Sequence, residues 1–275
     1  MKKLFFLLVW IPFVVNAQSL QPKWATQPVL KTPESVLYDA KTQQVFVSNI
    51  NGNPSVKDGN GFISLLSPDG KIIKLHWATG LNAPKGSAVY GGYLYVSDID
   101  RVARINLKQP DKMLFFPAPG AKFLNDVVAD DKGNIYITDT QNGALYKLEK
   151  GYAKIWIQSP LLAGANGLAM ENGKILLGAK DHLVQIDPET KSVKILVDNP
   201  GSIDGLIPLG DQKYLVSDWA GKIQIISPGK NPVVVSNTTK EKINAADMGY
   251  IPGENLVLIP TFFNNRVVAK ELIMH

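Results

Sequence analysis

The sequence predicts an all-β fold, specifically a six-bladed β-propeller with four-stranded blades. Two observations support this prediction. Short runs of alternating apolar residues recur between Gly, Asn and Asp turns, and the segments before these runs repeat with a period near 40 residues. A repeat of this length built wholly from strands is typical of a propeller, in which each repeat forms one blade.

The apolar runs are expected to form the second strand of each blade. They are rich in β-branched and aromatic residues, as half-buried strands are. The polar residues that follow them favour turns. The six runs cover residues 45–48, 94–98, 135–139, 175–177, 214–218 and 256–259.

One equivalent position recurs in the segment before each run, and we call the residues there the frame residues. Each begins the innermost strand of its blade, so their side chains should converge on one mouth of the central channel. The intervals between them are 51, 40, 41, 38 and 42 residues, and the polar insertion 51–61 explains the long first one and is placed to act as a lid. The frame residues are Glu34, Lys85, Asn125, Asn166, Asp204 and Ala246.

The N-terminal segment is expected to complete the last blade. The triplet Trp-Ala-Thr at 24–26 recurs at 77–79, where the outermost strand of the first blade should lie. The last blade ends at 266–273 and has room for only three strands of its own. A fourth strand from the N-terminus would close the ring and bury the exposed edges of the sheet.

The first 17 residues resemble a secretory signal peptide. Lys2 and Lys3 precede an apolar run over 4–15, and Ala17 ends a small-residue cleavage site. The run is short for a bilayer span, although an uncleaved anchor is the alternative. We therefore expect a signal peptide at 1–17 and a propeller domain at 18–275 that is periplasmic or secreted, without stable membrane insertion after cleavage.

Composition excludes several classes of site. The chain has no Cys and three His, which rules out disulfides, thiol nucleophiles and iron–sulfur clusters and argues against a multi-histidine zinc site. Any metal should be bound by oxygen. Loss of Lys2 and Lys3 would lower the formal charge from +5 to +3, and the remaining lysines are scattered, so no nucleic-acid partner is expected. A monomer is favoured.

Several polar and aromatic residues near the strand ends have a structural interpretation. Short polar pairs that end second strands should bond the backbone of the following turn. The aromatic residues should pack between blades rather than form a stacking surface. The polar pairs are 97–98, 138–139 and 217–218, and the aromatic residues are Tyr95, Tyr136, Trp156 and Trp219.

Four of the six frame residues carry a side-chain oxygen: Glu34, Asn125, Asn166 and Asp204. Two carboxylates and two amides on a rigid ring, completed by water, suit Ca²⁺, and another divalent cation is possible. The cation would also cancel two anions that otherwise raise each other's pKa in a narrow channel. The alternative is that Asn and Asp simply favour turns before strands and that Glu34 is solvated.

This spacing and the ordered set Glu34, Asn125, Asn166 and Asp204 resemble the calcium-dependent six-bladed propellers of the senescence marker protein (regucalcin), gluconolactonase and luciferin-regenerating-enzyme-like family. The resemblance covers essentially the whole of 18–275. It implies that Glu34, Asn166 and Asp204 are metal ligands and that Asn125 is a ligand or a substrate contact. It also implies hydrolysis of a lactone or a related ester, with Asp204 as general base, as nucleophile or as ligand only.

Two positions depart from that family. Phe123 stands where gluconolactonase-like members carry an Arg, which favours an apolar or aryl ester over a sugar lactone. Lys85 stands where paraoxonase-like members have a His, and it is either a catalytic base or anion-binding group, or a counter-ion to Asp247 or Glu34. His182 is expected in a surface loop, and no Ser-His-Asp triad can be assembled.

Two functions from different classes therefore stay open. The first is a metal-dependent hydrolase acting on a small lactone or ester. The second is a non-catalytic propeller of the NHL type, which binds a protein or glycan partner and holds a structural ion. A deep pocket with an open metal position would favour the enzyme, and a plugged channel with an exposed apolar face would favour the binding protein.

Overall fold

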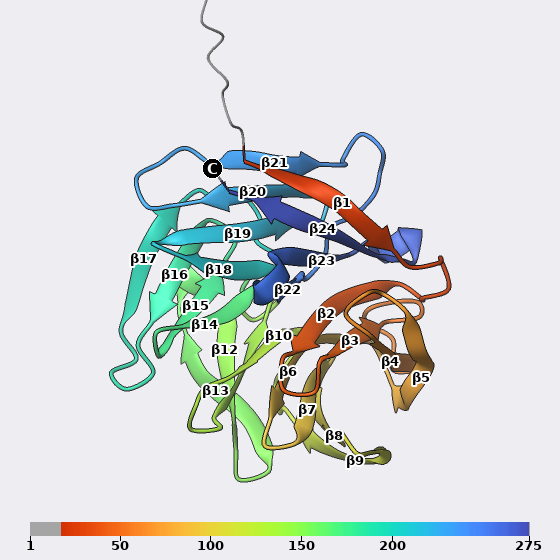
Figure 1. Cartoon of the computed structure of the whole chain (residues 1–275). Helices are drawn as coiled ribbons and strands as arrows, with labels where there is room; N and C mark the ends of the chain where they lie inside the picture. Colours follow the sequence, from red (N-terminus) through yellow and green to blue (C-terminus); the bar gives the residue numbers. More distant parts are fainter. Residues whose placement is uncertain (1–17, 275) are drawn as a thin grey trace, which may run out of the picture.

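The computed structural model describes residues 18–274 and shows a six-bladed β-propeller (Figure 1). Six four-stranded antiparallel sheets are arranged around a central channel. The fold prediction is confirmed. The signal-peptide prediction for residues 1–17 lies outside the described residues, as does His275.

Each of the first five blades uses four consecutive strands, ordered from the channel outward. Blade 1 contains β2 (Pro33–Asp39), β3 (Gln44–Asn49), β4 (Gly61–Leu66) and β5 (Ile72–Leu81). Blade 2 contains β6 (Pro84–Tyr90), β7 (Tyr93–Asp98), β8 (Arg101–Asn106) and β9 (Gln109–Pro117). Blade 3 contains β10 (Leu124–Ala129), β11 (Ile135–Asp139), β12 (Ala144–Glu149) and β13 (Tyr152–Gln158).

The next two blades repeat this order, and short 3-10 helices lie in some of the connections. Blade 4 contains β14 (Leu168–Glu171), β15 (Lys174–Gly178), β16 (His182–Ile186) and β17 (Val193–Asp198). Blade 5 contains β18 (Leu206–Gly210), β19 (Lys213–Asp218), β20 (Lys222–Ile226) and β21 (Val233–Asn237). The 3-10 helices are η1 (Pro160–Leu162), η2 (Pro252–Glu254) and η3 (Phe262–Asn264).

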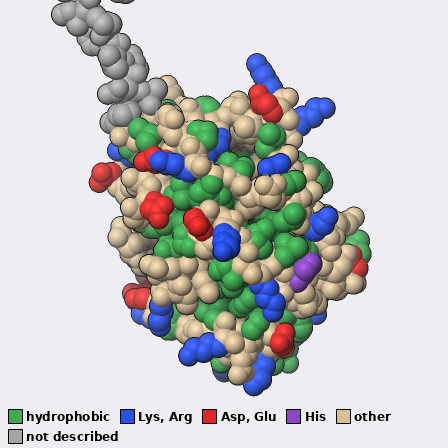
Figure 2. All heavy atoms as spheres, turned by 45° about the vertical axis from the view of Figure 1, so that its right-hand side comes forward, with side chains coloured by type: hydrophobic (Ala, Val, Ile, Leu, Met, Phe, Trp, Pro, Cys, Tyr) green, Lys and Arg blue, Asp and Glu red, His purple; other side chains and the backbone are tan. Residues whose placement is uncertain are grey.

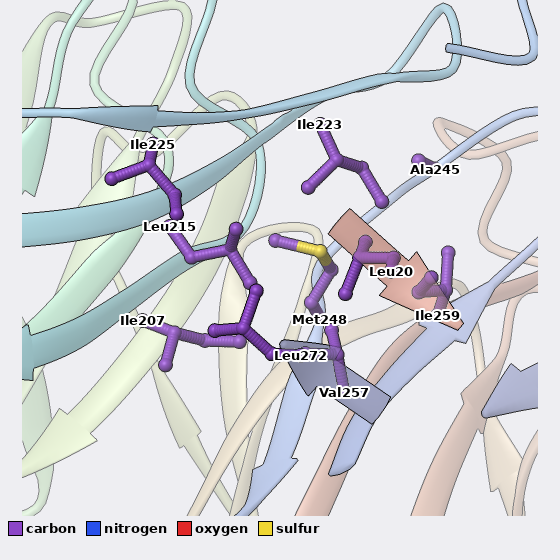
Figure 3. Packing of buried hydrophobic residues seen from close by; sticks show 10 residues of the cluster. All are labelled: Leu20, Ile207, Leu215, Ile223, Ile225, Ala245, Met248, Val257, Ile259 and Leu272. Carbon is purple, nitrogen blue, oxygen red and sulfur yellow. The ribbon is translucent and has the colours of Figure 1, made fainter. Parts of the chain in front are cut away.

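Both ends of the chain build the sixth blade. It contains β22 (Gly249–Ile251), β23 (Leu256–Pro260), β24 (Val267–Ile273) and, as its outermost strand, β1 (Ser19–Ala25). β1 pairs antiparallel with β24 and places Leu20 opposite Leu272. Both leucines pack against residues of β23 and of blade 5, including Val257 and Leu215 (Figure 3). The predicted closure by the N-terminal strand is confirmed.

The apolar core lies between neighbouring blades. Phe46 and Ile63 of blade 1 share one buried cluster with Leu94 and Val96 of blade 2. Each second strand contains the apolar run that predicted it, so alternate side chains of one strand reach opposite blade interfaces. The core is therefore a ring of interfaces that holds the channel-lining strands in fixed positions.

Two surface observations bear on partners. No helix of the described residues is long and apolar enough to cross a membrane. On the face shown in Figure 2, basic side chains are spread among acidic, polar and apolar ones and form no continuous stripe.

Candidate functional site

The structure brings five of the six frame residues together. Glu34, Lys85 and Asn125 lie at the second position of β2, β6 and β10, while Asn166 and Asp204 lie two residues before β14 and β18. All five line one cavity of about 500 Å³ at a mouth of the channel. The sixth frame residue, Ala246, is fully buried in an apolar cluster with Ile50 and Phe262.

The Asn125 amide is held by blade 3. Its Nδ2 donates to Thr140 Oγ1 (3.1 Å), and that hydroxyl in turn donates to the carbonyl of Ala165 (2.8 Å). Because the hydroxyl uses its proton on Ala165, it must accept from Asn125, which assigns nitrogen and oxygen of the amide. Asn125 Oδ1 is thereby left buried with no hydrogen-bond partner in the described chain.

Asn166 and Asp204 orient each other. Asn166 Nδ2 donates to Asp204 Oδ1 (2.5 Å), so each side chain keeps one oxygen for the cavity. Asn166 Oδ1 and Asp204 Oδ2 are buried and accept no hydrogen bond from residues 18–274. Glu34 completes the pattern, because its Oε2 is also buried without a donor. Four acceptor oxygens thus face one cavity without any protein donor.

This set of oxygens fits a hard divalent cation. Buried acceptors without donors are rare in folded proteins and call for an explanation such as a bound ion. Two carboxylate and two amide oxygens are ligands that Ca²⁺ prefers. Within residues 18–274 no group of three or more His, Cys, Asp or Glu side chains is arranged to hold an ion, so an ion at this cavity would also need amide oxygens such as those of Asn125 and Asn166.

The electrostatics of the ion-free protein agree with that interpretation. Burial, together with the charges of Asp204 and Asp247, raises the pKa of Glu34 well above its usual value, and the positive charge of Lys85 opposes this shift. Burial likewise raises the pKa of Asp204 to about 7, although the hydrogen bond from Asn166 lowers it. Both carboxyl groups therefore resist ionisation unless a cation is present.

Two further carboxyl groups lie deeper in the channel. Asp126 and Asp247 line a second cavity of about 320 Å³ that opens along the innermost strands. Asp247 Oδ2 accepts a hydrogen bond from Ser35 Oγ (2.6 Å), and Asp126 Oδ2 accepts one from the backbone of Leu168 (3.1 Å). Burial is the largest cause that raises the pKa of each, to about 7 for Asp247. Sequence reasoning missed Asp126 as part of this charged channel.

Lys85 lines the cavity with its amine bonded to backbone carbonyls. Its side chain is 1% exposed, and its Nζ donates to the carbonyls of Ala83 (3.2 Å) and Pro54 (3.3 Å). The same nitrogen lies 4.2 Å from the ring centre of Phe123. Carbonyls and a ring face both favour the charged form, although burial lowers its pKa overall. The catalytic role of Lys85 stays a prediction, and these contacts show that its amine also holds the backbone at Ala83 and Pro54.

The alternative prediction, that Lys85 is a counter-ion to Asp247 or Glu34, agrees only in part with the structure. Across residues 18–274 no carboxylate lies within 4 Å of its nitrogen. Its charge nevertheless lowers the pKa of Glu34, whereas Asp247 is not affected by it. Lys85 thus supports an ionised Glu34 from a distance.

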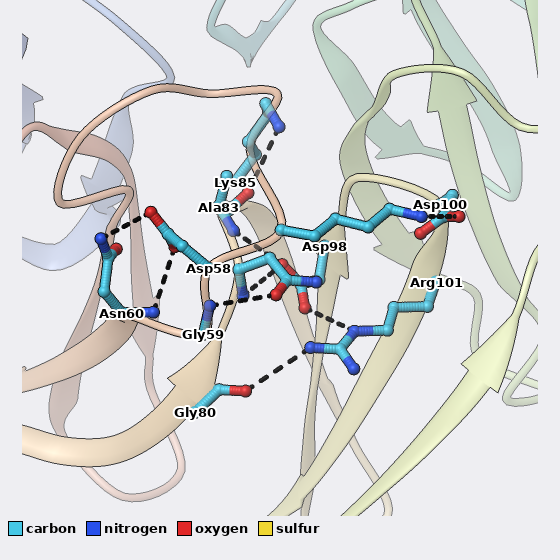
Figure 4. Close-up of polar contacts among 11 residues, drawn as sticks. Asp58, Gly59, Asn60, Gly80, Ala83, Lys85, Asp98, Asp100 and Arg101 are labelled. Atoms are coloured by element: carbon cyan, nitrogen blue, oxygen red, sulfur yellow. Dashed lines mark hydrogen bonds and ion pairs between the residues drawn. The ribbon is translucent and has the colours of Figure 1, made fainter.

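The insertion 51–61 borders the cavity and is tied down at several points (Figure 4). Pro54 accepts from Lys85, and Gly59 N donates to Asn82 Oδ1 (3.2 Å). Lys57 forms an ion pair of 2.5 Å with Asp100 of blade 2. The insertion therefore lies where a lid was expected, and these bonds hold it as a fixed rim.

The polar pairs at the strand ends hold the frame residues. Asp98 accepts from the backbone of Asn82 and Ala83, and Asp139 accepts from the backbone of Lys122 and Phe123. These are the residues just before Lys85 and Asn125 in the chain. Asp139 also bonds the following turn, as the sequence predicted, but the contacts to the preceding segment were not foreseen.

The neighbouring hydroxyl groups reach into the next blade. Ser97 Oγ donates to the carbonyl of Asn125, and Thr138 Oγ1 donates to the carbonyl of Asn166 (3.0 Å). Ser217 Oγ does the same to Ala246 (2.8 Å). A second strand in one blade therefore fixes the backbone of the frame residue in the next, which makes the ring of side chains rigid.

One side of the cavity is aromatic. Trp219, Phe262 and Phe263 line it, and their rings meet edge to face with centroids 4.9 to 5.9 Å apart. Trp219 packs between blades as predicted, since its ring meets Phe262 and Phe263 of blade 6, but the side chain is also 41% exposed at the mouth. Tyr136 and Trp156 do pack together, with centroids 5.0 Å apart, beside residues of blade 4.

The histidines of the described chain lie away from the cavity. His76 stacks on Phe62, with ring centroids 4.2 Å apart. His182 begins β16 rather than lying in a loop, and its Nδ1 is 2.9 Å from Asp198. Neither lines the mouth of the channel.

Comparisons at the level of sequence do not place the chain. No model of a known protein family matches it, and no curated protein matches it. Only solved structures show a likeness, and this likeness lies in the fold.

Three of these structures illustrate the range. A gluconolactonase of Xanthomonas campestris has a TM-score of 0.67 and 14% identity, over 92% of this chain and 87% of its own. A catalytically inactive His-to-Ala variant of virginiamycin B lyase from Staphylococcus aureus, solved with quinupristin, has a TM-score of 0.63 and 12% identity, over 93% and 100%. A chain of the nidogen–laminin complex has a TM-score of 0.59 and 17% identity, over 72% and 76%. At such identities the likeness shows the propeller fold alone.

Proposed function

We propose that this protein is a divalent-cation-dependent hydrolase of lactones or related esters, with Ca²⁺ as the cation. The observation that carries the proposal is the set of four buried oxygens without donors at one cavity. The fold shared with a gluconolactonase supports it. Glu34, Asn125 and Asn166 would hold the ion, with Asp204 either as a fourth ligand or as the general base.

The bound cation would act as a Lewis acid on the carbonyl oxygen of the substrate. The protein keeps its ligands in place without further adjustment, because Thr140 holds the Asn125 amide and Asn166 holds Asp204. Lys85 stabilises the ionised form of Glu34 and anchors the rim at Pro54. The cavity leaves room above these oxygens for a small substrate and a water molecule.

We propose Asp204 as the group that accepts a proton from the attacking water. Its Oδ2 faces the cavity, while its Oδ1 is occupied by Asn166. A carboxylate with a free oxygen in the cavity can accept a proton from water within hydrogen-bond reach. Only one oxygen is free, so Asp204 either holds the ion or takes the proton.

The first experiment measures Ca²⁺ binding and hydrolysis separately. Purified protein stripped with EDTA should bind one Ca²⁺ per chain by calorimetry and should hydrolyse members of a panel of lactones, aryl esters and phosphotriesters. Glu34→Gln should weaken Ca²⁺ binding at least about tenfold, whereas Glu189→Gln, at an exposed position, should not. The absence of hydrolysis across the panel with calcium loaded would reject the enzyme.

Asp204→Asn separates its two roles. If Asp204 is the base, the variant should bind Ca²⁺ nearly as well as the parent and lose turnover. If it is mainly a ligand, both should fall together. If the variant keeps both Ca²⁺ binding and turnover, Asp204 is not part of the site.

A lyase that relies on histidine is not supported. The His-to-Ala variant of virginiamycin B lyase is described as catalytically inactive. Within the described residues of this protein no His lines the cavity, since His76 and His182 both lie elsewhere.

A second candidate is a non-catalytic binding protein. The observation that favours it is the exposed aromatic surface at the mouth, where Phe263 is 67% exposed. The open cavity beneath that surface favours the enzyme, because a binding propeller needs no vacant position beside an ion. Calcium binding with no hydrolysis of the panel would select this alternative.

We also propose that the protein is exported. The support is the sequence of residues 1–17, with two lysines, an apolar run and Ala17. Mass spectrometry of the protein from its native host should show a chain that begins at Gln18 in the periplasmic or extracellular fraction. An intact N-terminus in the cytoplasm would contradict this.

A further inference from the structure

The aromatic side of the cavity is built from two blades. Trp219 directly follows β19 of blade 5, and Phe262 and Phe263 form η3 after β23 of blade 6. We call these three residues the aromatic wall. Their rings pack edge to face, so each supports the orientation of the others.

The residues beneath hold the wall in place. Phe262 is 7% exposed and packs with Ile50 and Ala246 in a buried cluster. The backbone of Trp219 accepts hydrogen bonds from Asn244 Nδ2 (3.0 Å) and from the backbone of Ala245 (3.3 Å). Phe263 is therefore presented at the mouth by a buried neighbour, and its exposure does not come from a loose loop.

The backbone at Phe262 is strained. Its φ is +47°, a left-handed value that bulky residues rarely adopt. Such strain persists where the surroundings enforce it, and it is found at ligand clamps. The enforcing contacts include Asn265, whose backbone N donates to the Phe262 carbonyl (3.0 Å) and whose Oδ1 accepts from Thr32 (2.9 Å).

The arrangement of the six blades determines which residues lie across the cavity from the aromatic wall. Blades three positions apart face each other across the channel, so Phe123 of blade 3 lies opposite Phe263 of blade 6. Lys85 of blade 2 likewise lies opposite Trp219 of blade 5. A ligand whose reacting group rests on Glu34 and its neighbours therefore meets the aromatic wall on one side, and Phe123 with the Lys85 amine beside it on the other.

We infer that the aromatic wall is a specificity determinant that selects esters or lactones carrying an aryl group. This inference rests on the proposed hydrolase, because it names the substrate class of the same cavity. Stacking on Trp219 and Phe263 would bury aromatic surface of the ligand and of the wall at the same time. The ligand carbonyl would then point toward the cation that these oxygens are proposed to bind.

The test compares two γ-butyrolactones that differ only at the ring carbon bearing the ring oxygen, with methyl or phenyl there. In the calcium-loaded parent, kcat/KM for the phenyl compound should exceed that for the methyl compound about tenfold. Phe263→Ala and Trp219→Ala should each lower this ratio to about threefold or less. Tyr152→Ala, which removes a 47% exposed aromatic residue of β13 outside the cavity, should keep the parent's ratio.

A binding measurement separates this inference from the proposed function. Calorimetry with 3-phenyl- and 3-methylcyclopentanone, which have a similar shape and cannot be hydrolysed, should show the same preference and the same loss in both wall variants. If neither lactone is turned over but the ketones are discriminated, the hydrolase is wrong and the wall stands. An unchanged phenyl-to-methyl ratio in both wall variants would overturn the inference, and thermal unfolding checks that the variants remain folded.

Discussion

Two pairs of buried carboxylates in this propeller have opposite surroundings. Asp98 and Asp139 are both fully buried: Asp139 accepts four backbone hydrogen bonds, and Asp98 accepts two and forms an ion pair with Arg101. Glu34 and Asp204 are buried almost as deeply, and each has an oxygen that no group of the described chain reaches. The first pair, the framework carboxylates, holds the backbone just before Lys85 and Asn125, whereas the second pair, the site carboxylates, lines the cavity itself.

The contrast shows that burial alone does not make a site. A carboxylate surrounded by N–H donors is stable as an anion, because the donors replace its water shell. A carboxylate without them keeps an unsatisfied charge, and its pKa rises, as it does for Glu34. An external cation is one way to satisfy it. The framework carboxylates are satisfied by protein donors, whereas the proposed ion would stabilise the site carboxylates.

The largest expected effect is on turnover in Asp204→Asn. Removal of the proposed base should lower kcat about 10³-fold in the calcium-loaded protein. The same change should stabilise the ion-free protein at pH 8, because it removes a buried charge. Steady-state kinetics and thermal unfolding in EDTA measure the two effects. A lower unfolding temperature without calcium would contradict the contrast between the two pairs.

The matched change in the framework should have the opposite effect on stability. Asp139→Asn places an amide among backbone donors and should cost about 3 kcal/mol of the free energy of unfolding. Urea denaturation in EDTA measures it, and addition of calcium should not restore the loss. A variant as stable as the parent would mean that these hydrogen bonds do not hold the mouth.

The stability of the ion-free protein should fall as the pH rises from 5 to 8. A carboxyl group whose pKa is higher in the folded than in the unfolded chain binds a proton on folding between those two values. Its contribution is therefore present at low pH and lost as the pH passes the folded value, about 7 for Asp204 and Asp247. Thermal unfolding in EDTA should show a decrease of at least about 5 °C.

Calcium should remove most of that decrease. The ion binds the deprotonated ligands, so its stabilising effect should grow over the same pH range. Matched scans in EDTA and in excess Ca²⁺ test this. Parallel curves at all pH values would show that the ion does not bind the titrating groups.

The smallest expected effect is that of Thr140→Val. This change removes the hydroxyl that fixes the Asn125 amide but leaves the ligand itself in place. Supporting residues of this kind commonly contribute about tenfold to metal affinity. Calorimetry should therefore show about tenfold weaker Ca²⁺ binding with little change in stability. Unchanged affinity would indicate that Asn125 is not a ligand.

The repeat made the fold and the frame residues predictable. The start of an innermost strand is defined by short-range pattern, and the ring then brings equivalent positions together. Thr140 and Asp126 could not be recognised in this way, because their importance depends on contacts with Asn125 and with the other carboxyl groups of the channel. The residues around Thr140 and Asp126 carry the same strand-end pattern as strand ends that take no part in a site.

The aromatic wall could not be predicted from the sequence either. Trp219 follows a strand whose pattern is the same as in other blades, and nothing local indicates that its side chain turns to the mouth. The position of Phe263 depends on the left-handed backbone at Phe262, which a run of two Phe and two Asn does not by itself reveal. The feature of the sequence that could have pointed to the wall is the pair of adjacent Phe residues in a turn.

The closure of the sixth blade has a consequence for synthesis of the protein. β1 is translated before the other strands, yet its partner β24 is translated after them, so β1 has no strand to pair with until residues 267–273 have been made. Contacts between such distant parts of a chain form slowly. A chain that stops before residue 267 would present β1 as an unpaired edge strand and invite association with other copies. Ring closure thus distinguishes complete chains from truncated ones.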